Sequence, residues 1–146
     1  MTERISIHQW RQLPPRRKPR VEREHFEQKA LFDWAHWESK KVPALALLFA
    51  IPNGGKRSKA VAGKLKAEGV KAGVPDICLP VACGQYHGLF IELKAEGGRP
   101  TLVQLEWQIK LIAQGYEAVI CRGWEEAKKT IETYLRYGPP LSGEVI

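Results

Sequence analysis

The fold is decided by two neighbouring stretches, DICLPV at residues 76–81 and HGLFIELK at residues 87–94. Both are short, dominated by apolar residues and separated by a turn around Gly84, which is the pattern of two strands joined as a hairpin. Side chains alternate between the two faces of a strand, so Glu92 and Lys94 point to the same side. Burying a glutamate and a lysine in an apolar strand is costly unless they pair or bind something.

The same hairpin brings a second carboxylate to this position. The start of its first strand lies beside the end of its second strand, so Asp76 is expected near Glu92 and Lys94. Two carboxylates that converge at one end of a sheet, with an ammonium group beside them, suit a hard divalent cation. The structural alternative is an acid at the start of a strand and a surface Glu–Lys pair.

The remaining pattern predicts an α/β domain, in which helices flank a small mixed β-sheet. Helices are indicated by apolar residues three or four apart with capping residues and glycine stops, and strands by short apolar runs. Beyond the hairpin, helices are expected at residues 22–40, 58–68, 101–115 and 125–137, and strands at 45–51 and 117–122.

Two of these helices carry apolar stripes that are typical of amphipathic helices. Core or dimer packing is the expected role of the tryptophans in them, whereas Trp10 is a candidate nucleic-acid contact because it stands among arginines. Apolar residues on both sides of the first helix also make it a candidate dimer interface. The stripes comprise Phe26, Ala30, Trp34 and Trp37 in the first helix and Leu102, Leu105, Ile109 and Ile112 in the third.

The composition of the 146 residues, 44% hydrophobic and 27% charged, predicts one globular domain. The longest uncharged apolar run, residues 44–51, is far shorter than the roughly 20 residues that cross a bilayer. With no apolar export signal near the start, a cytoplasmic location is expected. Cys78, Cys83 and Cys121 are expected to be buried, reduced thiols rather than disulfides or, with His87, a metal knuckle.

The net charge of +7 is concentrated in two blocks. Residues 1–20 and residues 56–71 each hold six cations against one acid, so each block carries +5 and the rest of the chain −3. Two basic patches on a mildly acidic body favour a surface that follows a polyphosphate such as a nucleic acid. A solubilising tail and a solvated helix face would show the same charges.

Several short motifs together resemble a known nuclease family. Asp76 follows Pro75, and Glu92-Leu93-Lys94 comes after fifteen intervening residues, which resembles the PD-(D/E)XK nuclease signature. In this order along the chain, IPNGGKR at 51–57, GVKAGVPD at 69–76, IELK at 91–94 and QLEW at 104–107 resemble the VRR-NUC (virus-type replication-repair nuclease) family. The resemblance covers about residues 22–135 and is to stand-alone, phage-type members.

The resemblance implies the PD-(D/E)XK fold and a metal-dependent active site. Asp76, Glu92 and the backbone carbonyl of Leu93 would hold Mg²⁺ or Mn²⁺, and Lys94 would orient the attacking water and stabilise charge on the phosphate. The family also places an acid on the first helix. Glu24, with Gln28 one turn later, matches that spacing, and Glu27 is the rival.

The resemblance also implies a glutamine near the active site, and Gln104 is the residue that matches it. A capping box with Thr101 would explain Gln104 equally well, because the two residues have the spacing of that motif.

Nucleic-acid contacts are expected around the second basic block. Asn53 and Gly54 occupy the family's Asn-Gly turn, where they either contact phosphate or simply form the turn. Lys56, Arg57 and Lys59 belong to the basic block and are expected to face DNA.

The resemblance therefore implies a Mg²⁺- or Mn²⁺-dependent, structure-specific DNA endonuclease. For stand-alone members it implies a homodimer that cuts four-way (Holliday) junctions inside a bacterial or phage-infected cell, which suits a two-fold enzyme. A flap or replication-fork nuclease and a non-catalytic DNA-binding module are the alternatives. The expected organisation is a basic arm at 1–21, the nuclease domain at 22–137 and a short tail at 138–146.

Overall fold

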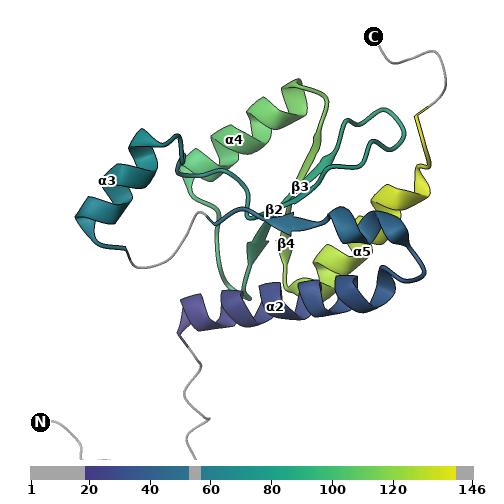
Figure 1. Cartoon of the computed structure of the whole chain (residues 1–146), viewed down its shortest axis with the longest axis horizontal. Helices are drawn as coiled ribbons and strands as arrows, with labels where there is room; N and C mark the ends of the chain where they lie inside the picture. Colours follow the sequence, from purple (N-terminus) through teal and green to yellow (C-terminus); the bar gives the residue numbers. More distant parts are fainter. Residues whose placement is uncertain (1–18, 53–56, 141–146) are drawn as a thin grey trace, which may run out of the picture.

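The computed structural model describes residues 19–52 and 57–140, which form one four-stranded sheet with helices on both faces (Figure 1). This architecture confirms the predicted α/β class and the predicted order of helices and strands. The elements are α2 (Arg20–Glu38), the 3₁₀ helix η1 (Pro43–Leu47), β1 (Phe49–Ala50), α3 (Lys59–Ala67), β2 (Ile77–Leu79), β3 (Leu89–Lys94), α4 (Leu102–Ala113), β4 (Glu117–Arg122) and α5 (Trp124–Arg136).

The strands lie in the order β1-β2-β3-β4, and the sheet is mixed. β2 pairs antiparallel with both β1 and β3, which confirms the predicted hairpin, and Ile77 lies opposite Ile91. β3 and β4 are parallel. α4 connects them and returns the chain to the end of the sheet at which β3 begins. This register places the residue before β2, Asp76, beside Glu92.

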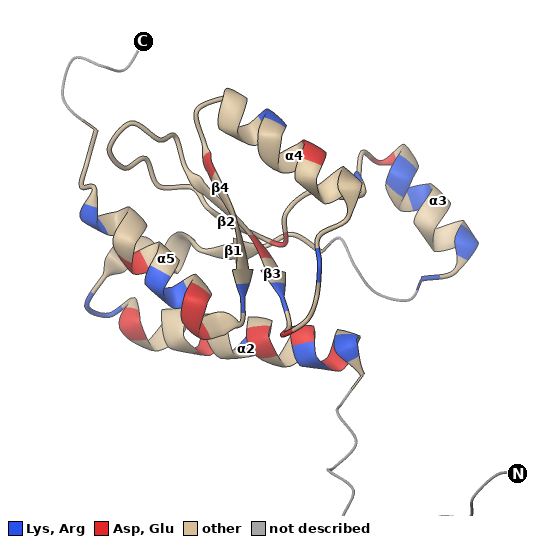
Figure 2. Ribbon diagram, turned by 180° about the vertical axis from the view of Figure 1, so that it is seen from behind, with Lys and Arg blue, Asp and Glu red and all other residues tan. Residues whose placement is uncertain are grey.

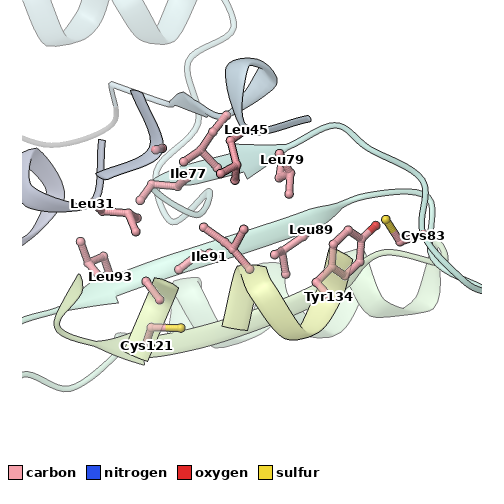
Figure 3. Close-up of a cluster of buried hydrophobic side chains, with 14 residues drawn as sticks. Leu31, Leu45, Ile77, Leu79, Cys83, Leu89, Ile91, Leu93, Cys121 and Tyr134 are labelled. Atoms are coloured by element: carbon pink, nitrogen blue, oxygen red, sulfur yellow. The ribbon is translucent and has the colours of Figure 1, made fainter. Parts of the chain in front are cut away.

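The main hydrophobic core fills the space between the sheet and the pair of helices α2 and α5 (Figure 3). β3 contributes its alternate residues Leu89, Ile91 and Leu93 to this face, as strand periodicity predicts. Opposite them, α2 buries Leu31, and the hydroxyl of Tyr134 on α5 donates a 2.6 Å hydrogen bond to the carbonyl of Val81. The other face of β3 is therefore free to present its polar residues towards α4.

The predicted strand at 45–51 is correct only in part. Residues 45–47 belong to η1, and only Phe49–Ala50 pairs with β2. Leu45 and Leu48, three residues apart, are buried, whereas Leu47 is 53% exposed. A three-residue period is that of a 3₁₀ turn, and Pro43 is well placed at its start. An uninterrupted apolar run does not by itself distinguish a strand from a helical segment.

Both apolar stripes expected for the helices differ from the buried faces. In α2 the buried residues are Leu31 and Ala35. Of the expected stripe, Trp34 packs partly buried against the core, whereas Phe26 and Trp37 are 59% and 69% exposed. In α4 no residue is buried, and Leu102, Ile109 and Ile112 face outward. The reason in α4 is that its inner side is polar: Gln108 Nε2 donates a 2.9 Å hydrogen bond to the carbonyl of Ala118 on β4.

The ends of the expected domain are only partly visible. α2 begins at Arg20, inside the arm expected at 1–21, and residues 1–18 and 141–146 lie outside the described residues, as does Trp10.

Among the described helices, none is long and apolar enough to cross a membrane. All three cysteines are buried and unpaired, as predicted.

Candidate active site

The three residues of the sequence motif lie together at one end of the β2–β3 pair. The backbone N–H of Leu93 donates a 2.9 Å hydrogen bond to Asp76 Oδ2, which fixes this carboxylate beside the end of β3. Lys94 Nζ lies 3.1 Å from Glu92 Oε1, and both residues are only 4% exposed. The pair on β3 is therefore buried rather than a solvated surface pair.

Gln104 on α4 joins this cluster and also caps its helix. Its Nε2 atom donates a 2.7 Å hydrogen bond to Glu92 Oε1, while its Oε1 atom accepts one of 2.8 Å from the N–H of Thr101. Thr101 Oγ1 in turn accepts from the N–H of Gln104, completing a capping box. The two explanations of Gln104 are compatible, since one side chain makes both sets of contacts.

Burial and mutual repulsion shape the electrostatics of the two carboxyl groups. Burial, and then the negative charge of Asp76, raise the pKa of Glu92 to about 7, although Lys94 opposes the shift. Burial also raises the pKa of Asp76, against the Leu93 N–H bond and the charge of Lys94. The folded protein thus holds two acids that a bound cation would stabilise in their charged forms.

The structure separates the two candidate acids of the first helix. Glu27 Oε2 accepts a 2.7 Å hydrogen bond from the N–H of Trp124 and so caps the start of α5. The negative charge of Glu24, by contrast, adds to the rise in the pKa of both Asp76 and Glu92. Glu24 also pairs with Arg20, whose Nε lies 3.1 Å from its Oε1. Because Glu27 is engaged in capping α5, Glu24 is retained as the candidate acid of the first helix.

One oxygen of Glu92 has no hydrogen-bond partner. Glu92 Oε1 forms an ion pair with Lys94 Nζ and accepts a hydrogen bond from Gln104 Nε2, whereas the buried Oε2 atom accepts no hydrogen bond. Within residues 19–52 and 57–140, no three His, Cys, Asp or Glu side chains are arranged to hold a metal ion. Mg²⁺ commonly binds to one or two carboxylates and keeps several waters, so the Asp76–Glu92 pair with its open oxygen fits such an ion.

Sequence reasoning missed two residues that support the loop before Asp76. Trp107 Nε1 on α4 donates a 3.1 Å hydrogen bond to the carbonyl of Ala72. Gly73 has φ +84°, and a Cβ there would collide with the side chain of Val103 on α4. In the sequence, this loop is indicated only by two glycines, Gly69 and Gly73, on either side of residues 70–72. They predict a turn but do not show which helix packs against it.

The residues expected to face DNA are only partly described. Asn53, Gly54 and Lys56 lie outside the described residues. Arg57 Nη2 donates a 2.9 Å hydrogen bond to the carbonyl of Pro52, and Lys59 is exposed in the first turn of α3. Both lie on a segment apart from the cluster around Glu92 (Figure 2).

A mixed sheet whose hairpin carries an Asp, a Glu and a Lys at one end defines a nuclease domain of the PD-(D/E)XK type. A family model described as the VRR-NUC domain matches residues 17–125. A solved structure of a VRR_NUC domain protein is similar at a TM-score of 0.67 and 32% sequence identity, covering 80% of this chain and 91% of that chain. Comparison with curated proteins finds no match. The chain belongs to the VRR-NUC family.

Proposed function

We propose that this nuclease is a divalent-metal-dependent DNA endonuclease whose active site comprises Asp76, Glu92 and Lys94. The observation that carries the proposal is the buried Glu92. Its Oε1 atom is held by Lys94 and Gln104, its Oε2 atom is open, and Asp76 stands beside it. A module that only binds DNA gains nothing from a buried carboxyl group beside a second, half-buried one, because the two repel each other and burying such a group costs folding free energy.

Asp76 and Glu92, with the carbonyl of Leu93, would hold Mg²⁺ or Mn²⁺, and Glu24 would contribute directly or through water. When bound, such an ion lowers the pKa of a coordinated water and neutralises the scissile phosphate. The Lys94 ammonium is a compact donor that orients the attacking water and stabilises the negative charge developing on the phosphate oxygens. Gln104 is a positioning residue, since it fixes the orientation of the Glu92 carboxylate.

We further propose that the substrate is a four-way DNA junction and that the enzyme acts as a homodimer. A two-fold dimer presents two equivalent sites to a substrate that is itself nearly two-fold, so each site nicks one strand. The large exposed apolar residues on α2, Phe26 and Trp37, support the expectation that this helix is the interface. Asn53, Lys56, Arg57 and Lys59 are proposed to contact the DNA backbone.

The test is cleavage of a labelled four-way junction, beside a flap, a fork and a plain duplex, in Mg²⁺, Mn²⁺ or EDTA. The variant is Asp76→Asn, and the matched control is Asp33→Asn, because Asp33 is an exposed acid paired with Lys29 on α2. We expect paired, metal-dependent nicks in the junction from the wild type and the control, and none from Asp76→Asn.

Other outcomes assign the protein to the alternatives. Preferential cutting of the flap or fork would retain the chemistry and reject the junction as substrate. Salt-sensitive DNA binding without cleavage in either metal would indicate a non-catalytic module. A solution mass of one protomer, measured by light scattering with DNA absent and present, would reject the homodimer.

A further inference from the structure

The basic helix α3 stands apart from the rest of the domain. It follows residue 58 as a nine-residue helix whose first turn is capped by Ser58 Oγ, which accepts a 3.2 Å hydrogen bond from the N–H of Val61. None of its residues is buried, and it projects beyond the sheet and the other helices (Figure 1). Three lysines lie in its nine residues, and much of its ribbon has the colour of Lys and Arg (Figure 2). Core packing therefore does not explain the position of this helix.

A cavity of about 610 Å³ separates α3 from the segment that follows it. Its lining combines three cations, Arg57, Lys66 and Lys71, with small or aliphatic side chains. Among its described lining residues there is no acid and no aromatic ring. The lining residues are Arg57, Ala62, Leu65, Lys66, Val70, Lys71 and Ala72.

A second cavity, of about 330 Å³, continues this groove towards the catalytic cluster. It shares Val70 and Lys71 with the first cavity and extends to Trp107 and Val74, which is two residues from Asp76. The hydrogen bond from Trp107 to Ala72 anchors the connecting loop to α4. The two cavities thus form one path from α3 to the edge of the candidate active site.

We propose that this groove, lined by Lys66 and Lys71 on either side, binds the sugar–phosphate backbone of a DNA duplex arm outside the scissile position. The proposal rests on the proposed function and extends it to a second DNA contact. Cations without a neighbouring acid match phosphates, and the aliphatic residues match deoxyribose. Single-strand grooves combine positive charge with aromatic stacking platforms. The cavity beside α3, which holds Lys66 and Lys71, has no aromatic ring among its described lining residues, so its occupant is a duplex.

The test measures duplex and junction binding in EDTA as a function of salt, so that it does not depend on cleavage. The variant is Lys66→Gln with Lys71→Gln. The matched control, Lys110→Gln with Lys129→Gln, removes two exposed lysines from α4 and α5. The slope of log K against log salt changes by about 0.9 for each phosphate of duplex DNA that the protein no longer neutralises.

We expect the variant to lower the magnitude of this slope by about 1.8 and the affinity at 0.1 M salt by roughly tenfold for each lysine, with the control unchanged. Lys66→Arg with Lys71→Arg should restore both quantities, which separates charge from any loss of fold. A Gln variant with the slope and affinity of the wild type would overturn the proposal. A loss of affinity confined to single-stranded DNA would also overturn it, and so would a wild type that binds no DNA. None of these outcomes depends on whether Asp76→Asn stops cleavage, which tests the proposed function separately.

Discussion

Gln104 on α4 donates a 2.7 Å hydrogen bond to Oε1 of Glu92 on β3, and so connects a helix N-terminus to the buried carboxylate of the site. Glu92 Oε1 therefore has two donors, Gln104 and Lys94, while Oε2 stays open. This asymmetry orients the carboxylate with one oxygen available. The geometry of the candidate site consequently depends on α4 as well as on the hairpin.

Replacing Gln104 with alanine should reduce cleavage through the orientation of Glu92. Loss of a side chain that orients a metal-ligating carboxylate typically lowers metal affinity or activity by about 10- to 100-fold. The capping contribution, about 1 kcal/mol of unfolding free energy, would be lost as well. Thr101→Ala is the matched control, because it removes the hydroxyl cap and leaves the hydrogen bond between Gln104 and Glu92. Equal cleavage rates for the two variants would contradict a positioning role for Gln104.

Lys94→Met should abolish cleavage while DNA binding in EDTA stays within a few-fold of the wild type. The ammonium is 4% exposed and lies 3.1 Å from Glu92 Oε1, so its loss removes the buried cation from the site. Lys94→Arg should not restore the rate, since a planar guanidinium does not reproduce a compact ammonium in this space. Single-turnover cleavage rates measure the effect. Full activity of Lys94→Met would exclude Lys94 from the chemistry.

In the metal-free protein, stability should fall as the pH rises from about 4.5 to about 7. The pKa of Glu92 is about 7 in the folded state against 4.5 for an ordinary glutamate, chiefly because the group is buried. Between these values the folded state holds a proton that the unfolded chain has released, so raising the pH favours unfolding. Chemical denaturation at several pH values in EDTA, compared with Glu92→Gln, measures this slope. An identical slope in the variant would assign it to other groups.

Gly73→Ala should destabilise the domain by about 2 kcal/mol, because Gly73 has φ +84° and its added Cβ would meet Val103. Gly63→Ala is the matched control. Gly63 lies inside α3 with nothing within 4 Å of its Cβ position, so alanine there should add about 0.5–1 kcal/mol of helix stability. Thermal denaturation of both variants provides the comparison. A neutral Gly73→Ala would show that the loop before Asp76 accommodates a side chain.

The β2–β3 hairpin and the placement of its polar residues were predicted correctly because the information is local. Strand alternation places Glu92 and Lys94 on one face, and a short hairpin brings Asp76 beside them. The sequence did not show which side of α4 faces the sheet: its apolar stripe, including Ile109, faces outward, while Gln104 and Gln108 face the sheet. A helix that covers a polar site inverts the usual pattern, which periodicity alone does not reveal.

Interactions between distant segments also escaped prediction. Glu27 caps α5 across 97 residues of sequence, and this hydrogen bond favours Glu24 over Glu27 as the candidate acid of the first helix. The separation of α3 from the domain is another such feature, because the sequence shows an ordinary capped helix with an apolar side. Both depend on tertiary packing rather than on local propensity.

The central claim is that Asp76 and Glu92 share one divalent cation. Calorimetric titration of Mn²⁺ into the wild type, Asp76→Asn and Glu92→Gln, with Asp33→Asn as the control, tests it most directly. We predict that the wild-type and control chains each bind Mn²⁺ and that both site variants fail to bind it. Undiminished Mn²⁺ binding by Asp76→Asn and Glu92→Gln would contradict a shared cation.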